Sequence, residues 1–118
     1  MRSGVRVKRA ESFWDRLLGV GFQVSWRDFD ALCLPRCRTV HTFALSKPID
    51  VVFVSVEGVI LSVHSRVPPW RIVIAVDSKV VEIWEFPAGA CRRHAFVPGR
   101  LIKDLLTAEL LKAGWSDA

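Results

Sequence analysis

The feature that most constrains the fold is the segment 38–66, where three apolar, β-branched runs are separated by two turn signals. The predicted elements, in order, are strand Arg38–Leu45, turn Ser46–Ile49, strand Asp50–Val56, turn Glu57-Gly58 and strand Val59–Arg66. The middle run is apolar on both faces apart from Ser55, which is typical of an interior strand. The sequence therefore predicts an antiparallel meander at the centre of the chain.

Further strands are predicted on both sides of the meander. Ala31–Leu34 is a short apolar run that ends at Pro35, and Phe22 to Trp26 alternates with polar residues. Asp77-Ser78 reads as the turn of a second hairpin, formed by Arg71–Val76 and Lys79–Phe86. Residues 1–9 are predicted to form a polar tail or a short edge strand, because Val5 and Val7 alternate with Arg6 and Lys8.

A short helix is predicted near each end of the chain. Ser12 can cap a helix of about two turns that stops at Gly19. After Pro98-Gly99, apolar residues recur at the spacing of an amphipathic helix. These residues are Leu101, Ile102, Leu105, Leu106, Leu110 and Leu111.

These elements together predict a mainly β fold, either a small antiparallel β-sandwich or a partly closed barrel, with a helix near each end. The 118 residues correspond to one domain. We expect residues 5–102 to form the β domain and residues 103–118 to form a helical extension that packs on it. The alternative for this extension is pairing with a second copy of the chain, which would make a homo-oligomer.

Charge and composition exclude few functions. The net charge is +5, but the basic residues are scattered, and only Arg2, Arg6, Lys8 and Arg9 form a run without acids. Nucleic-acid binding through this run is the weakest of our hypotheses. No apolar run approaches the ~20 residues of a membrane span, and no apolar segment follows the basic N-terminus. We therefore expect a cytoplasmic protein without a secretory signal.

Five short motifs occur in an order that is seen in one bacterial and archaeal family. They are Arg16–Val20, Cys37–Phe43, Pro48–Phe53, Pro68–Arg71 and Glu85–Gly89. On these motifs the chain resembles the family catalogued as domain of unknown function 192, over about residues 5–102. The resemblance implies a compact, mainly β domain of sandwich type, and it implies no established activity, cofactor or substrate.

The family's motif positions fall on a set of residues scattered over the whole β domain. They are Arg16, Gly19, His41, Thr42, Phe43, Pro48, Asp50, Phe53, Glu85, Pro87 and Gly89. Two places depart from the family pattern. Ala44-Leu45 stands where the family often has Gly-Met or a similar pair, and Gly99-Arg100 stands where it usually has Gly-Asp. A base in place of an acid argues against any role that needs a carboxylate there.

His41 and Asp50 are the most suggestive polar pair. In the predicted hairpin they share one face but lie four residues apart along the strands, about 13 Å at ~3.3 Å per residue. In that register they cannot form a hydrogen bond. The alternatives are a buried histidine bonded to backbone or another side chain, and an aspartate that accepts backbone N–H groups of its turn.

Cysteine and histidine spacing raises the question of a metal site. Cys33, Cys37 and His41 are four residues apart, which would align them on a helix, but the segment is predicted as strand, Pro35 and strand. Zinc usually needs four ligands, and no close pair completes a set. We therefore expect three thiols, with Cys91 as the third, and neither a metal nor a cofactor. No Gly-x-Ser-x-Gly motif or glycine-rich phosphate loop is present.

Trp70 follows two prolines and precedes Arg71, so it is predicted to lie in a loop. Such a side chain can stack on a ligand, or it can plug one end of a barrel. The sequence favours a non-catalytic binding or accessory domain, and the alternative is a small hydrolase that uses His41 and Asp50. The candidate ligand-binding residues are His41, Thr42, Asp50, Trp70, Arg71 and Glu85.

Overall fold

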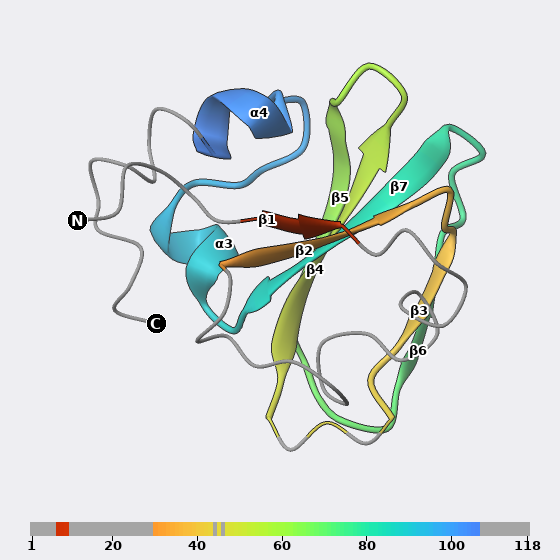
Figure 1. Ribbon diagram of the computed structural model, residues 1–118, viewed down its shortest axis with the longest axis vertical. Coiled ribbons are helices and arrows are strands. Elements are labelled where there is room, and N and C mark those ends of the chain that lie inside the picture. Colours follow the sequence, from red (N-terminus) through yellow and green to blue (C-terminus); the bar gives the residue numbers. More distant parts are fainter. Residues whose placement is uncertain (1–6, 10–29, 44, 46, 107–118) are drawn as a thin grey trace.

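Two facing sheets and two short helices make up the described part of the computed structural model, which comprises residues 7–9, 30–43, 45 and 47–106 (Figure 1). The large sheet has the strand order β1-β2-β7-β4-β5, and the small sheet pairs β3 with β6. The strands are β1 Val7–Arg9, β2 Ala31–Pro35, β3 Thr39–His41, β4 Ile49–Ser55, β5 Ile60–Val67, β6 Ile72–Ile74 and β7 Val80–Pro87. Because the sheets stay separate, the sandwich prediction is confirmed and the barrel alternative is wrong.

The large sheet has an apolar core on each face. One core packs against the helices α3 (Ala90–Arg93) and α4 (Ile102–Asp104), and it includes Val52 and Val54 of β4. The other core packs against the small sheet, and it includes Val51 and Phe53 of the same strand. Since side chains alternate along a strand, β4 must be apolar on both faces, and all seven of its residues are buried. The prediction of an interior strand is confirmed.

The β4–β5 hairpin is also confirmed. Glu57 and Gly58 form its turn, and Gly58 has φ 84°, a left-handed conformation that glycine adopts readily. The backbone N–H of Gly58 donates to the Ser55 carbonyl at 2.9 Å and so closes the turn.

Two other predicted hairpins are wrong. The strand β3 pairs with β6, Val40 lying opposite Val73, and not with β4. The strand β7 pairs with β2 and β4, and not with β6. Both edges of β4 are already occupied by β5 and β7, so β3 has no edge of β4 to join. The segments 42–48 and 75–79 are therefore crossings between the two sheets.

The Asp77 crossing is fixed by polar contacts. The Asp77 carboxylate accepts the backbone N–H of Lys79 at 2.8 Å. The Arg38 guanidinium donates to the carbonyl oxygens of Ala75, Asp77 and Val80. The predicted turn at Asp77-Ser78 is thus confirmed, but it carries the chain from the small sheet to the large sheet.

The remaining elements lie near the ends of the chain. Residues Val7–Arg9 form an edge strand, which confirms one of the two predicted alternatives for this segment. This strand, β1, runs parallel to β2, so the sheet is not wholly antiparallel. The short helix α3 was not predicted, because four residues leave no helical periodicity to detect. The predicted helix at residues 12–19, the strand Phe22–Trp26 and the segment after Leu106 lie outside the described residues. In the part of the chain that is described, no helix has the length and apolarity to cross a membrane.

Leu105 connects the C-terminal segment to the domain. It is fully buried in the core beside α4, while Lys103 points to solvent. We expect Leu105→Ala to lower the free energy of unfolding by about 2–5 kcal/mol, because it removes buried methyl groups and leaves a cavity. Asp104→Ala is the matched control, because Asp104 is exposed on the same turn, and should change it by less than about 0.5 kcal/mol. Urea denaturation measures both, and equal stability of the two variants would contradict docking of this segment.

Candidate functional site

Asp50 is a buried carboxylate that holds three segments together. It lies on β4, on the face of the large sheet that carries α3, and it is 0% exposed. Its Oδ1 accepts the backbone N–H of Arg66 at 2.8 Å, and its Oδ2 accepts those of Gly89 and Cys91, each at 3.0 Å. The expectation that Asp50 accepts backbone N–H groups is confirmed, but the donors come from distant segments and not from its own turn.

Cys91 lies against this carboxylate. Burial raises the pKa of the Cys91 thiol well above its ordinary range, and the negative charge of Asp50 raises that pKa further. A thiolate here would be both desolvated and next to a like charge. Cys91 therefore remains a thiol at neutral pH, which argues against a nucleophilic role.

Thr42 joins the end of β3 to the segment that precedes β6. Its side chain is 0% exposed, its Oγ1 donates to the Pro68 carbonyl at 2.6 Å, and the same oxygen accepts the Arg71 N–H at 2.8 Å. Its backbone N–H donates to the Arg71 carbonyl at 2.9 Å, and its own carbonyl accepts the Trp70 N–H at 3.1 Å. Four hydrogen bonds thus fix the backbone on which Trp70 is carried.

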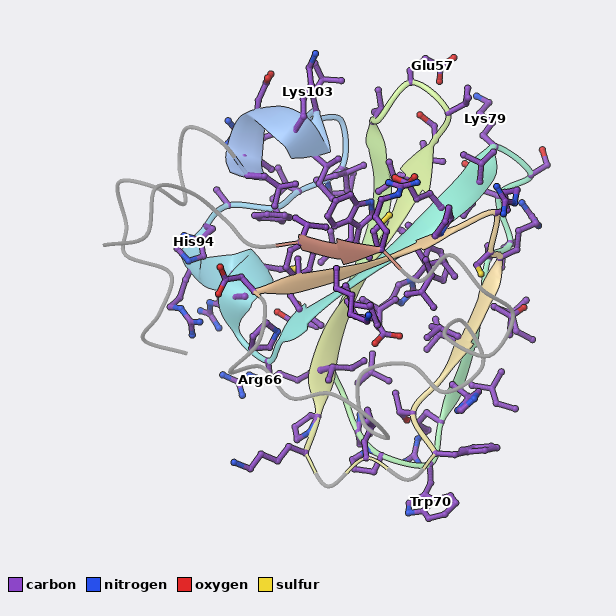
Figure 2. All side chains as sticks on the ribbon, viewed as in Figure 1. Glu57, Arg66, Trp70, Lys79, His94 and Lys103 are labelled. Carbon is purple, nitrogen blue, oxygen red and sulfur yellow. The ribbon has the colours of Figure 1, made fainter. Side chains whose placement is uncertain are left out.

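Trp70 is held in an unfavourable conformation at the surface. Its φ is 65°, a left-handed value that costs a non-glycine residue of order 1–3 kcal/mol. Its side chain is 66% exposed and projects away from the ribbon (Figure 2). The Phe43 ring lies 5.5 Å from the Trp70 ring, and the His41 ring lies 5.0 Å from the Phe43 ring, measured between centroids. The His41 Nδ1 accepts the backbone N–H of Phe43 at 3.3 Å, which fixes the histidine ring in this row.

The row of rings continues onto the outer face of the small sheet. His41 pairs with Ile72 across the strands, so the two side chains leave the sheet on the same side. Ile72 and Ile74 are 57% and 63% exposed, while the intervening Val73 packs against the core. We call the continuous surface formed by these side chains the apolar surface. Its members are His41, Phe43, Trp70, Ile72 and Ile74.

The fold brings together four of the six residues proposed from the sequence. His41, Thr42, Trp70 and Arg71 meet at the joint between β3 and β6, where Thr42 organises the backbone and the others reach the surface. The exposure of Trp70 agrees with a loop position and not with a plug inside a barrel.

Asp50 and Glu85 do not join this group. Asp50 faces α3, whereas His41 lies on the outer face of the small sheet, so the large sheet separates the two side chains. Glu85 lies in the middle of the large sheet, opposite Leu32 and Val51, and is 1% exposed. A His41–Asp50 pair is therefore not available for hydrolysis.

Phe43, Ile72 and Ile74 were missed as site residues. Phe43 carried a signal, because it belongs to the His-Thr-Phe motif. The isoleucines carried none, because Arg71–Val76 is apolar at every position after its arginine and reads as an interior strand.

The cysteines are distributed between the two cores. Cys33 is buried with the residues that face the helices, and Cys37 packs against the core of the small sheet. Among the residues that the structure describes, no three His, Cys, Asp or Glu side chains gather as a metal site would require.

Asp50→Asn tests the structural role of the carboxylate. An amide is uncharged, and its NH2 group cannot accept from Gly89 and Cys91, so we expect the free energy of unfolding to fall by about 3 kcal/mol. Asp77→Asn is the matched control, because Asp77 also accepts a backbone N–H but is exposed. Chemical denaturation of both variants gives the comparison. Similar losses in the two would contradict a special role for Asp50.

The raised pKa of Cys91 predicts a loss of stability at alkaline pH. Because the folded pKa exceeds the unfolded value of about 8.5, this group's contribution is fully present below pH 8.5 and is lost as the pH rises above it. The free energy of unfolding should fall there by up to about 1.4 kcal/mol per pH unit. Cys91→Ala should have a shallower slope than the parent between pH 8.5 and 10. Identical slopes in the two proteins would refute the prediction.

The comparisons with known proteins support the same fold. A protein of unknown function from Novosphingobium aromaticivorans is 18% identical, with a TM-score of 0.69, over 80% of this chain and 71% of the other. A protein from Sinorhizobium meliloti, described as a proposed transcription regulator, is 22% identical, with a TM-score of 0.66, over 79% of this chain and 76% of the other. At these identities the likeness concerns the fold alone. No curated protein matched the chain. The family DUF192, "Uncharacterized ACR, COG1430", matches residues 1–103, and the chain belongs to this family.

Proposed function

We propose that this chain is a non-catalytic binding domain that receives a protein partner on the apolar surface. The observation that supports this most is Trp70, whose large ring is 66% exposed on a backbone held at φ 65° by Thr42. Strained backbone persists where the surrounding structure over-determines it, and it gathers at functional sites. Here four hydrogen bonds maintain a conformation that leaves most of the indole exposed.

The exposure of the apolar surface favours a macromolecule over a small ligand. Pockets for small molecules bury most of the ligand's surface between walls of protein. Trp70, Ile72 and Ile74 are each more than half exposed, so a small ligand stacked on them would remain largely in water. A protein partner can cover all of these side chains at once, and tryptophan is enriched among the residues that contribute most binding energy at the centre of such contacts.

The partner segment is expected to be apolar and acidic. Arg71 follows Trp70 directly, is exposed, and its guanidinium forms no ion pair with any described residue. The chain as a whole carries a charge of +5. A segment with apolar side chains for Ile72 and Trp70 and a carboxylate for Arg71 would complement this surface.

The competing hypotheses have less support. A hydrolase using His41 and Asp50 lacks the required proximity. For nucleic-acid binding through the basic N-terminus, Arg2 and Arg6 lie outside the described residues. Arg9, in β1, donates to the Cys33 sulfur at 3.6 Å. Neither observation favours that function, and the cytoplasmic location stays a prediction.

Selection of peptides from a random display library tests the proposal. Peptides that bind the full chain should combine aromatic or aliphatic residues with Asp or Glu. Trp70→Gly should weaken their binding at least tenfold, measured by fluorescence anisotropy. Glycine suits the positive φ, so the variant should keep its thermal stability, and the loss can be assigned to the missing ring. Val56→Ser is the matched control, because Val56 is 76% exposed in the distant β4–β5 turn.

Three outcomes would contradict the proposal. Peptides that bind Trp70→Gly as tightly as the parent would place the binding surface elsewhere. Self-association of the parent that is lost in Trp70→Gly, measured by sedimentation, would make a second copy the occupant. Binding of single-stranded DNA that depends on Trp70 at physiological salt would assign the rings to base stacking.

A further inference from the structure

A second surface with different chemistry lies at the other end of β5 from the β4–β5 turn. A β-carbon placed on Gly89 would lie 3.1 Å from Arg93 Nη1 and 3.2 Å from Arg66 Nη2. The two guanidinium groups therefore converge over the same glycine, with those nitrogens about 6 Å apart or less. Arg66 comes from the end of β5 and Arg93 from α3, so the tertiary fold brings together two cations 27 positions apart in the chain.

The backbone that carries the two arginines is fixed from below. Asp50 accepts the N–H groups of both Arg66 and Gly89, and both residues have left-handed φ values, 52° and 91°. The backbone of Arg93 in α3 is fixed relative to Gly89, because the Arg93 N–H donates to the Gly89 carbonyl at 3.1 Å. The buried hydrogen-bond network thus fixes the backbone positions from which the two arginine side chains extend.

The charges over Gly89 are not compensated within the described structure. Arg66 and Arg93 are both exposed, and neither guanidinium makes an ion pair or hydrogen bond with a residue that the structure describes. Asp50 contributes one negative charge beneath them, but its oxygens are occupied by backbone N–H groups. Two cations over one anion leave a net positive site, and like charges held this close favour a shared counter-ion.

We propose that Arg66 and Arg93 form a binding site for a phosphate group, seated over Gly89. Charge-assisted hydrogen bonds of about 2.8 Å from each guanidinium to phosphate oxygens span the separation between the two groups. Glycine at position 89 lets both guanidinium groups lie this close to the backbone, since a β-carbon there would be 3.1 Å and 3.2 Å from their nitrogens. A phosphate group has at least three acceptor oxygens with which to bridge two guanidinium groups, whereas a carboxylate has two. The site is independent of the apolar surface and of the function proposed for it.

Thermal unfolding of the full chain in sodium phosphate and in sodium chloride of equal ionic strength tests the site. Phosphate binds the folded state and should raise the midpoint, while chloride should not. Phosphate titrations followed by the Gly89 amide resonance should give a dissociation constant that rises at least tenfold in Arg66→Gln and in Arg93→Gln. Arg100→Gln removes one exposed charge elsewhere and should change it less than twofold.

The same variants separate binding from folding. In chloride, Arg66→Gln and Arg93→Gln should unfold at the parent's temperature or above it, because each removes a repulsion and keeps the backbone N–H. Glycerol phosphate and vesicles that contain phosphatidic acid distinguish a soluble from a lipid source, and arginine-dependent binding of either supports the site. Phosphate binding that survives both substitutions, or that falls equally in Arg100→Gln, would overturn the proposal. Acetate binding as tight as phosphate would overturn the assignment to phosphate.

Discussion

The structure depends most on one buried charge, the carboxylate of Asp50. A carboxylate without water is strongly unfavourable unless it is well hydrogen-bonded, and here three backbone N–H groups supply the bonds. The donors lie at the end of β5 and at the start of α3, so hydrogen bonding to the Asp50 carboxylate fixes the position of both segments. The left-handed backbones of Arg66 and Gly89 both lie at this contact, and the two arginines converge over the glycine.

Thr42 has a comparable role in the other layer. Its buried hydroxyl and backbone fix the crossing from β5 to β6 against the end of β3. In both places a buried polar residue holds an exposed residue at an unfavourable φ. Asp50 does so for Arg66, and Thr42 does so for Trp70. The internal polar groups therefore determine which side chains the molecule presents, and the two presented surfaces differ: one is apolar and aromatic, the other is cationic.

Several site residues were evident in the sequence, while their grouping was not. His41, Thr42 and Trp70 were recognisable from motifs and from the Pro68-Pro69 break. Asp50 was recognisable as well, but the predicted hairpin places it in one site with His41. That assignment assumed a β3–β4 hairpin, and once β3 pairs with β6 the large sheet lies between the two residues. The arginine pair left no local signal, because Arg66 and Arg93 belong to different elements and meet only through Asp50.

Local sequence patterns were sufficient to predict the mainly β class, the interior position of β4, the Glu57-Gly58 hairpin and the end of β2 at Pro35. Each of these depends on local chemistry, such as side-chain alternation, the conformational freedom of glycine or the missing N–H of proline. The pairing of the strands, and the sheets that each crossing joins, could be read only from the three-dimensional structure. An apolar strand such as Ile72–Ile74 has the same pattern whether its outer face is covered or exposed. Its partner depends on which strand edges remain available, and both edges of β4 are paired, one with β5 and the other with β7.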